Sequence, residues 1–152
     1  MTTAWLIDTN IVIYSYDETQ ELHSSSYSFL EHVFSGHLSA SIAHQNLLEF
    51  LAVVTNPKRV EHPLSPDEAF EKIAVYAANF PIIYPSARTF LTFADLLSRH
   101  SSLRERVFDL YLGATALDNG ITQICIWNVR HLRAISELTV KTPEEILTLS
   151  KK

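Results

Sequence analysis

Cysteine, glycine and long apolar runs are scarce in this chain of 152 residues. Cys125 is the only cysteine, so no disulfide can form within the chain, and its apolar neighbours predict a buried thiol that suits a reducing cytoplasm. With three glycines and no Gly/Ser-rich linker, the sequence offers no internal boundary, and we expect one domain over residues 1–152. No segment approaches about 18 consecutive apolar residues and no signal-peptide pattern opens the chain, which argues against membrane spanning and secretion.

Positive charge is also in deficit, because the formal net charge is −5. This balance argues against a protein that binds nucleic acid through a broad basic surface. The charge does not argue against a localised nucleic-acid site, since a divalent metal held by several carboxylates offsets the repulsion that a phosphate would meet there. The composition, 47% hydrophobic and 19% charged, is otherwise that of an ordinary domain with a real core.

Short apolar runs alternate with segments of helical periodicity along the whole chain. Expected strands lie at residues 4–8, 37–41, 81–85, 121–127 and 138–142. Expected helices lie at residues 10–16, 24–35, 42–55, 66–79, 86–100, 108–119 and from 143 onward. This order predicts an α/β fold, a three-layer α/β/α sandwich with a central, mainly parallel sheet. The continuous apolar run 121–127 suits an inner strand, and the run 81–85, bounded by prolines, suits an edge.

Polar residues before these helices predict how each begins. Thr9 or Asn10 is expected to cap the first helix, and Ser41 the helix that starts at residue 42. Ser65 and Thr142, each followed by proline and acids, are expected to cap the helices that follow them.

Asp8 ends the first apolar run and is the first candidate functional residue. In a parallel sheet, ligands bind in the crevice at the carboxyl ends of the strands, where Asp8 is expected to lie. Aspartate at a strand end is also a common turn former, so the interpretation depends on neighbouring residues.

Two further acids lie in apolar helical segments, Glu49 and Asp109. Each has a structural alternative, because Glu49 could pair with a buried arginine and Asp109 could cap its helix. An ionised acid in such surroundings is costly unless it is paired or metal-bound. Together with Asp8 they predict an oxygen-ligand site for Mg²⁺ or Mn²⁺. Asn128, at the end of the run 121–127, is expected to face the same crevice with an amide oxygen.

Other polar residues carry weaker signals. Asp118 follows Asp109 by nine positions, half a turn away from the same helix face, and is expected to cap the helix or face solvent. Four cations near predicted loops are either phosphate contacts or scattered surface charge: Lys58, Arg59, Arg130 and Arg133. The seven histidines show no metal-ligand spacing, so zinc is not expected.

Four segments, in order, resemble the motifs of a known family. They are residues 6–10 (LIDTN), 41–50 (SIAHQNLLEF), 108–117 (FDLYLGATAL) and 124–132 (ICIWNVRHL). The chain resembles the PIN domain, and within that family the VapC-like toxins of bacterial toxin–antitoxin pairs. Any one of these patterns is weak, whereas four at domain-wide spacing are fairly specific.

The resemblance implies a metal-dependent endoribonuclease. Asp8 and Asp109 would be direct ligands of Mg²⁺ or Mn²⁺, Glu49 a ligand or the group that orients the attacking water, and Thr9 and Asn10 would support the first ligand. Metal-assisted hydrolysis of an RNA phosphodiester would leave a 5′-phosphate and a 3′-hydroxyl.

The fourth motif departs from the fuller family pattern, in which an acid often stands where this chain has Asn128 and a threonine or serine stands where it has Trp127. We interpret the asparagine as reducing metal affinity, to the point of losing one of two ions, without abolishing activity.

The same resemblance implies partners. A cognate antitoxin would cover the active site with its carboxyl-terminal segment, and the protein would form a homodimer. Aromatic residues of the first two helices could form a groove for such a peptide or belong to the core: Tyr14, Tyr16, Tyr27 and Phe34.

Two other classes of function stay open at this stage. A phosphatase would use Asp8 as a nucleophile, although Asn10 stands where such enzymes carry a second aspartate. A PIN-like module that binds RNA or protein without catalysis is the non-enzymatic alternative, supported by Asn128 and the acidic net charge.

Overall fold

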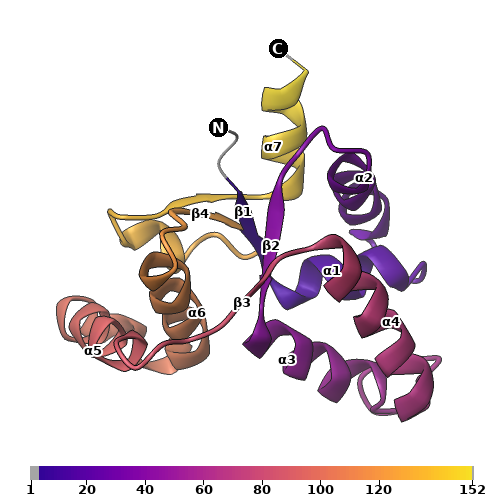
Figure 1. Cartoon of the computed structure of the whole chain (residues 1–152), viewed down its shortest axis with the longest axis horizontal. Coiled ribbons are helices and arrows are strands. Elements are labelled where there is room, and N and C mark those ends of the chain that lie inside the picture. Colours follow the sequence, from indigo (N-terminus) through magenta and orange to yellow (C-terminus); the bar gives the residue numbers. More distant parts are fainter. Residues whose placement is uncertain (1–3, 152) are drawn as a thin grey trace.

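The computed structural model describes residues 4–151 and places a five-stranded sheet between two groups of helices (Figure 1). All four strand pairings are parallel, and the strand order is β3-β2-β1-β4-β5. The strands are β1 (Trp5–Ile7), β2 (Ala40–Ala43), β3 (Ile82–Ile83), β4 (Gln123–Cys125) and β5 (Thr139–Lys141). As expected from their sequences, β3 lies at an edge and β4 lies inside the sheet.

Seven α-helices and two 3₁₀ segments connect the strands within the described residues. The helices are α1 (Thr9–Tyr16), α2 (His23–Phe34), α3 (His44–Val54), α4 (Pro66–Asn79), α5 (Thr89–Arg99), α6 (Val107–Asp118) and α7 (Pro143–Ser150), with 3₁₀ turns at Ser101–Arg106 and Leu132–Ala134. The sequence signals did not predict the turn before α6. None of these helices is long and apolar enough to cross a membrane.

Side chains that alternate along β1 divide the core into two layers. Trp5 and Ile7 pack with apolar residues of α1, α2, α3, α4 and α7, whereas Leu6 packs with residues of α5 and α6. Figure 1 shows the same division, with α5 and α6 to the left of the sheet and α1 to α4 to its right. The predicted three-layer α/β/α sandwich is therefore confirmed.

Three predictions about the ends of elements are wrong. The second strand includes Ser41, which is buried inside it and does not cap α3. Asn46 instead accepts a hydrogen bond from the Ala43 amide at 3.1 Å through its side-chain oxygen. The fourth strand ends at Cys125, so Asn128 lies three residues beyond it, because the chain turns at Trp127 and continues into the 3₁₀ turn. Neither Thr9 nor Asn10 caps the first helix.

The capping predictions for two other helices are confirmed. Ser65 caps α4 and Thr142 caps α7, each in a reciprocal capping box with the glutamate three residues later. Both caps form between residues close in sequence, which explains why local sequence signals were enough to predict them.

Candidate active site

Asp8 follows β1 directly and faces the carboxyl edge of the sheet. Its amide donates to the Cys125 carbonyl of β4 at 3.0 Å, which extends the β1–β4 pairing by one step. Its carboxylate accepts from the Asn10 amide at 3.4 Å and so caps α1 itself. The side chain is only 8% exposed. Asp8 is thus held rigidly where strand and helix meet.

Glu49 is fixed by hydrogen bonds to both carboxylate oxygens. Thr9 Oγ1 donates to Oε2 at 3.0 Å, and Gln45 Nε2, one turn earlier on α3, donates to Oε1 at 2.7 Å. Thr9 Oγ1 in turn accepts from Nδ2 of the buried Asn46 at 3.0 Å. This chain of bonds joins the start of α1 to the start of α3 and orients Glu49 toward Asp8.

Asp109 reaches the same place from the first turn of α6. Gln45 Nε2 also donates to the Phe108 carbonyl at 3.1 Å, which ties the start of α6 to α3. The three predicted acids thereby line one cavity of about 340 Å³ at the carboxyl edge of the sheet. Its full lining is Asp8, Thr9, Asn10, Ile13, Glu49, Ala52, Val53, Arg59 and Asp109.

The electrostatics of the pocket favour a cation. Burial, together with the nearby charges of Asp109 and Glu49, raises the pKa of Asp8 to about 7 against the lowering effect of the Asn10 amide. Burial also raises the pKa of Asp109, an effect that Arg106 and His131 oppose. Ionised Asp8 is thus poorly stabilised by the protein alone.

The carboxylates share the pocket without forming a preassembled ligand cage. Across residues 4–151, no three side chains among His, Cys, Asp and Glu lie close enough to hold one ion together. Both oxygens of Glu49 are already engaged by Thr9 and Gln45. The three acids therefore line one pocket, as the sequence predicted. Their carboxylates would have to move closer together to bind one ion.

A model of the PIN domain matches residues 5–135 of this chain. The chain belongs to the PIN domain family. A curated relative, ribonuclease VapC43 of Mycobacterium tuberculosis, is 26% identical over 118 residues, which cover 76% of this chain and 80% of the relative.

Two solved structures have the same fold. VapBC2 of Rickettsia felis, bound to a DNA fragment from its promoter, matches with a TM-score of 0.67 at 18% identity, covering 92% of this chain and 98% of that one. VapC20 of Mycobacterium tuberculosis, described as a Sarcin-Ricin loop cleaving toxin, matches with a TM-score of 0.65 at 12% identity, covering 87% of this chain and 95% of that one.

Two predicted residues of the PIN domain lie outside the pocket. Asn128 is exposed and does not belong to the cavity lining, because β4 ends before it. Asp118, which we excluded from the acidic cluster, ends α6 and accepts hydrogen bonds from Ser86 and Thr89. These bonds lower the pKa of Asp118 and fix the segment before α5.

Sequence reasoning missed two polar residues that organise the PIN site, Gln45 and Asn46. The signal for Gln45 was present, since residues four apart lie on one helix face and Gln45 precedes Glu49 by four. Asn46 gave no comparable signal, because its role depends on contact with Thr9, 37 residues earlier. Arg59, weighed as a phosphate contact or as scattered surface charge, lines the acid pocket.

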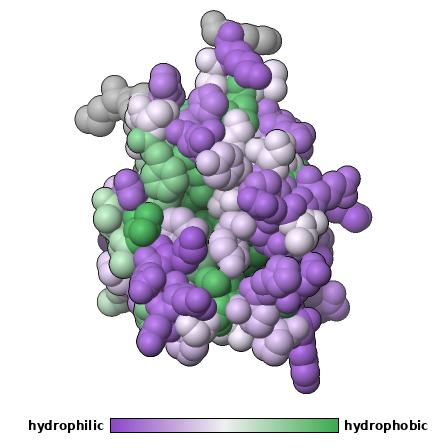
Figure 2. Space-filling model, turned by 90° about the vertical axis from the view of Figure 1, so that its right-hand side faces the viewer, coloured by the Kyte–Doolittle hydropathy of each residue, from purple (hydrophilic) through white to green (hydrophobic). Residues whose placement is uncertain are grey.

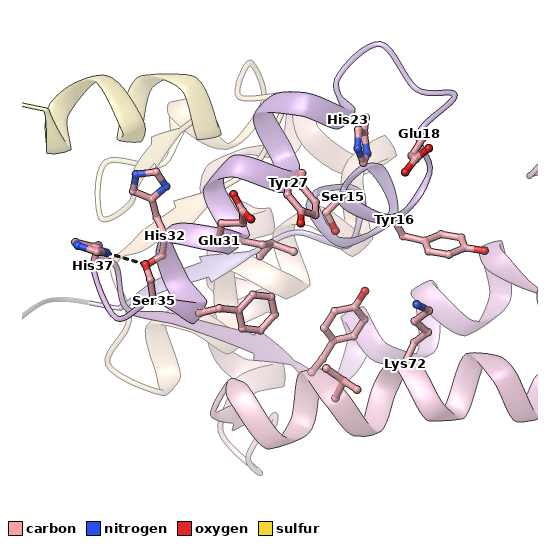
Figure 3. Close-up of a pocket in the computed structure, with 14 residues that line it drawn as sticks. Ser15, Tyr16, Glu18, His23, Tyr27, Glu31, His32, Ser35, His37 and Lys72 are labelled. Atoms are coloured by element: carbon pink, nitrogen blue, oxygen red, sulfur yellow. Dashed lines mark hydrogen bonds between the residues drawn. The ribbon is translucent and has the colours of Figure 1, made fainter.

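A second, larger hollow of the PIN domain, about 1140 Å³, lies between α2 and α4. Figure 2 shows apolar side chains gathered in a depression that polar side chains surround. Tyr16, Tyr27 and Phe34 line this groove, and Figure 3 shows Tyr16 and Lys72 on its walls, the ammonium 5.2 Å from the ring centre. Tyr14 does not line it and packs against the core instead, the alternative that the sequence left open for these aromatic residues.

Proposed function

We propose that this PIN domain is a divalent-metal-dependent endoribonuclease, the toxin of a toxin–antitoxin pair. The observation that carries the proposal is the meeting of Asp8, Glu49 and Asp109 in one pocket at the carboxyl edge of a parallel sheet. The relatives named as ribonucleases support the reaction class. A phosphatase is disfavoured, because Asn10 cannot act as the acid and base that such an enzyme needs.

The residues present fit Mg²⁺ or Mn²⁺. Carboxylate oxygens are the ligands these hard cations take, and they keep several waters when bound. Gln45 Oε1 is a buried acceptor without a hydrogen-bond partner among the described residues, on the side chain whose Nε2 donates to Glu49. Asp8 and Asp109 would hold the ion, and Glu49 would bind it or orient water.

The chain's own residues supply positioning for hydrolysis. A bound divalent ion would offset negative charge on the phosphate and make water a better nucleophile. Thr9 and Gln45 keep Glu49 in one orientation, and Asn46 keeps Thr9 in place. As water attacks, its oxygen bonds to phosphorus and the P–O3′ bond breaks. A proton from the water passes to the departing 3′ oxygen, which leaves a 5′-phosphate and a 3′-hydroxyl.

Cleavage of single-stranded RNA by the purified protein tests the proposal. We expect cleavage with Mg²⁺ or Mn²⁺ and none with EDTA. Asp109→Asn should abolish it, whereas Asp118→Asn, the same change at the far end of α6, should keep it. A trapped acyl phosphate on Asp8 would establish the phosphatase instead. RNA binding without cleavage under any metal would establish the non-catalytic module.

The groove between α2 and α4 is our proposed binding site for an antitoxin. Tyr27 is 49% and Phe34 47% exposed, and both line the groove, so it presents aromatic surface to a partner. The solved relatives include toxin–antitoxin complexes, such as one from Klebsiella pneumoniae. An amphipathic segment with aromatic or aliphatic anchors fits such a groove. The expected homodimer and cytoplasmic location stay predictions, to be checked by light scattering and by cell fractionation.

A further inference from the structure

Arg59 brings a positive charge to the acid pocket. It lies in the loop between α3 and α4 and is part of the cavity lining, together with the three acids. The loop is held in shape, because the Lys58 amide donates to Asn56 Oδ1 at 2.9 Å and the Arg59 amide to the Asn56 carbonyl at 2.9 Å. Val60, next along the chain, is buried. The position of Arg59 is thus set by a folded turn.

The guanidinium of Arg59 has no carboxylate partner within the described part of the chain. Ion pairs there involve only Arg99 and Arg133 among the arginines. Arg106 and His131 also lie near enough to Asp109 for their charges to oppose the rise in its pKa. An acidic protein therefore places Arg59 in the lining of its acid pocket and further positive charge near Asp109, as binding of a phosphate chain would require.

Phe108 supplies an exposed aromatic face next to the acid pocket in the sequence. It directly precedes Asp109, and its side chain is 75% exposed. Its backbone is fixed by the hydrogen bond from Gln45, which also holds Glu49. Val107 before it is also exposed, and Arg104, Glu105 and Arg106 before that are charged and exposed. An exposed ring close to cations is suited to stacking on a nucleotide base.

We propose, on the basis of the ribonuclease function above, that single-stranded RNA crosses the acid pocket with a phosphate on Arg59 and a base stacked on Phe108. Arginine matches phosphate geometry with two parallel N–H donors, and every base offers a face to an aromatic ring. Arg59 and Phe108 are binding residues in this proposal, and they place the intervening phosphodiester over Asp8, Glu49 and Asp109.

Each contact has a matched control in the chain. Lys58 carries the same charge in the same loop without lining the pocket. Phe90 is a second exposed phenylalanine, on α5. In an Asp8→Asn background, which prevents cleavage, we expect Arg59→Ala and Phe108→Ala each to weaken binding of a short single-stranded RNA about tenfold. Lys58→Ala and Phe90→Ala should change it less than about twofold. Equal effects within either pair would overturn the proposal.

A substrate change separates stacking from a structural role of Phe108. Once the cleavage position is mapped, RNA with one abasic nucleotide beside it should be bound about tenfold more weakly by the protein with Phe108. In the Phe108→Ala variant, the same abasic substitution should weaken RNA binding little further, because the base and the ring form a single contact that either change removes. Full additivity, or a change of oligomeric state in Phe108→Ala without loss of RNA affinity, would show instead that Phe108 serves protein contact. The binding results for the alanine variants are independent of cleavage, whose absence in the wild type would refute only the ribonuclease.

Discussion

Thr9 Oγ1 donates to Glu49 Oε2 at 3.0 Å while it accepts from Asn46 Nδ2 at 3.0 Å. One hydroxyl thus links a carboxylate at the mouth of the pocket to a buried amide at the base of α3. The relationship explains why a small polar residue follows Asp8. It also makes the orientation of Glu49 depend on a residue that does not itself carry charge.

Replacement of Thr9 by valine tests this link. The side chains have similar shape, but valine leaves Glu49 with Gln45 as its one remaining donor among these residues and leaves Asn46 Nδ2 without its acceptor. We expect cleavage to fall ~10–100-fold, the usual effect of losing a partner that orients a ligand. Stability should fall by ~1–3 kcal/mol, because Asn46 is buried. Thr9→Ser keeps the hydroxyl and should retain most activity; a serine variant as poor as the valine variant would contradict the role of the hydroxyl.

Asp8 should destabilise the metal-free fold at neutral and higher pH. Its pKa is about 7 in the folded chain against an ordinary value of 3.8. At a pH between these two pKa values, the folded chain therefore keeps a proton on Asp8 that the unfolded chain has lost. Stability should therefore fall as pH rises from about 4 to 7. Asp8→Asn should be more stable than wild type by on the order of 2–4 kcal/mol at pH 8. Urea unfolding measures the difference.

The same comparison at low pH is the control. Near pH 4 the wild-type carboxyl is protonated in the folded state, so the two proteins should have nearly equal free energies of unfolding. A stability difference that stays constant from pH 4 to 8 would show that Asp8 is not the titrating group.

Metal affinity should follow the same carboxyl group. Below pH 7, Asp8 has to lose its proton before it can bind a cation, so apparent affinity for Mn²⁺ should decline by up to about tenfold per pH unit. Above pH 7 it should level off. Isothermal titration between pH 5.5 and 8.5 measures the curve, and an affinity that is flat across pH 7 would exclude Asp8 as a ligand.

The fold and the acidic pocket could be predicted because their signals are local. Apolar runs located every strand, capping boxes identified the starts of α4 and α7, and the strand-end position of Asp8 predicted the edge of the sheet where it lies. Glu49 and Asp109 stood out because carboxylates are rare in apolar helices.

The residues that failed prediction depend on distant parts of the chain. Ser41 has the composition of a helix cap, yet pairing of Leu6 with Ser41 keeps it inside β2. The strand signal at 121–127 continued past Cys125, but the β5 partner ends at Lys141, opposite Cys125, so Asn128 leaves the sheet. Register of this kind is decided by neighbouring strands, which no local pattern reports.

The groove between α2 and α4 should bind an antitoxin independently of catalysis. Tyr27→Ala removes an exposed ring and should weaken binding of the antitoxin's carboxyl-terminal peptide about tenfold, with RNA cleavage unchanged. Leu91→Ala, an exposed apolar residue on α5, should leave peptide binding as it is. Fluorescence anisotropy with a labelled carboxyl-terminal peptide of the cognate antitoxin measures both. Unchanged peptide affinity in the Tyr27→Ala variant would place the antitoxin at another surface.

Asn128 offers a test of how many ligands the pocket needs. We propose that its amide oxygen contributes weakly at the outer edge of the site, where many family members are expected to carry an acid. Because it is exposed and outside the cavity lining, Asn128→Ala should reduce cleavage only about two- to threefold, far less than Asp109→Asn. On this proposal Asn128→Asp should tighten Mn²⁺ binding several-fold, since it replaces an amide oxygen with a carboxylate. Isothermal titration of both variants also gives the number of ions bound. An unchanged affinity in Asn128→Asp would remove residue 128 from the metal site and leave the three acids of the pocket as its only carboxylate ligands.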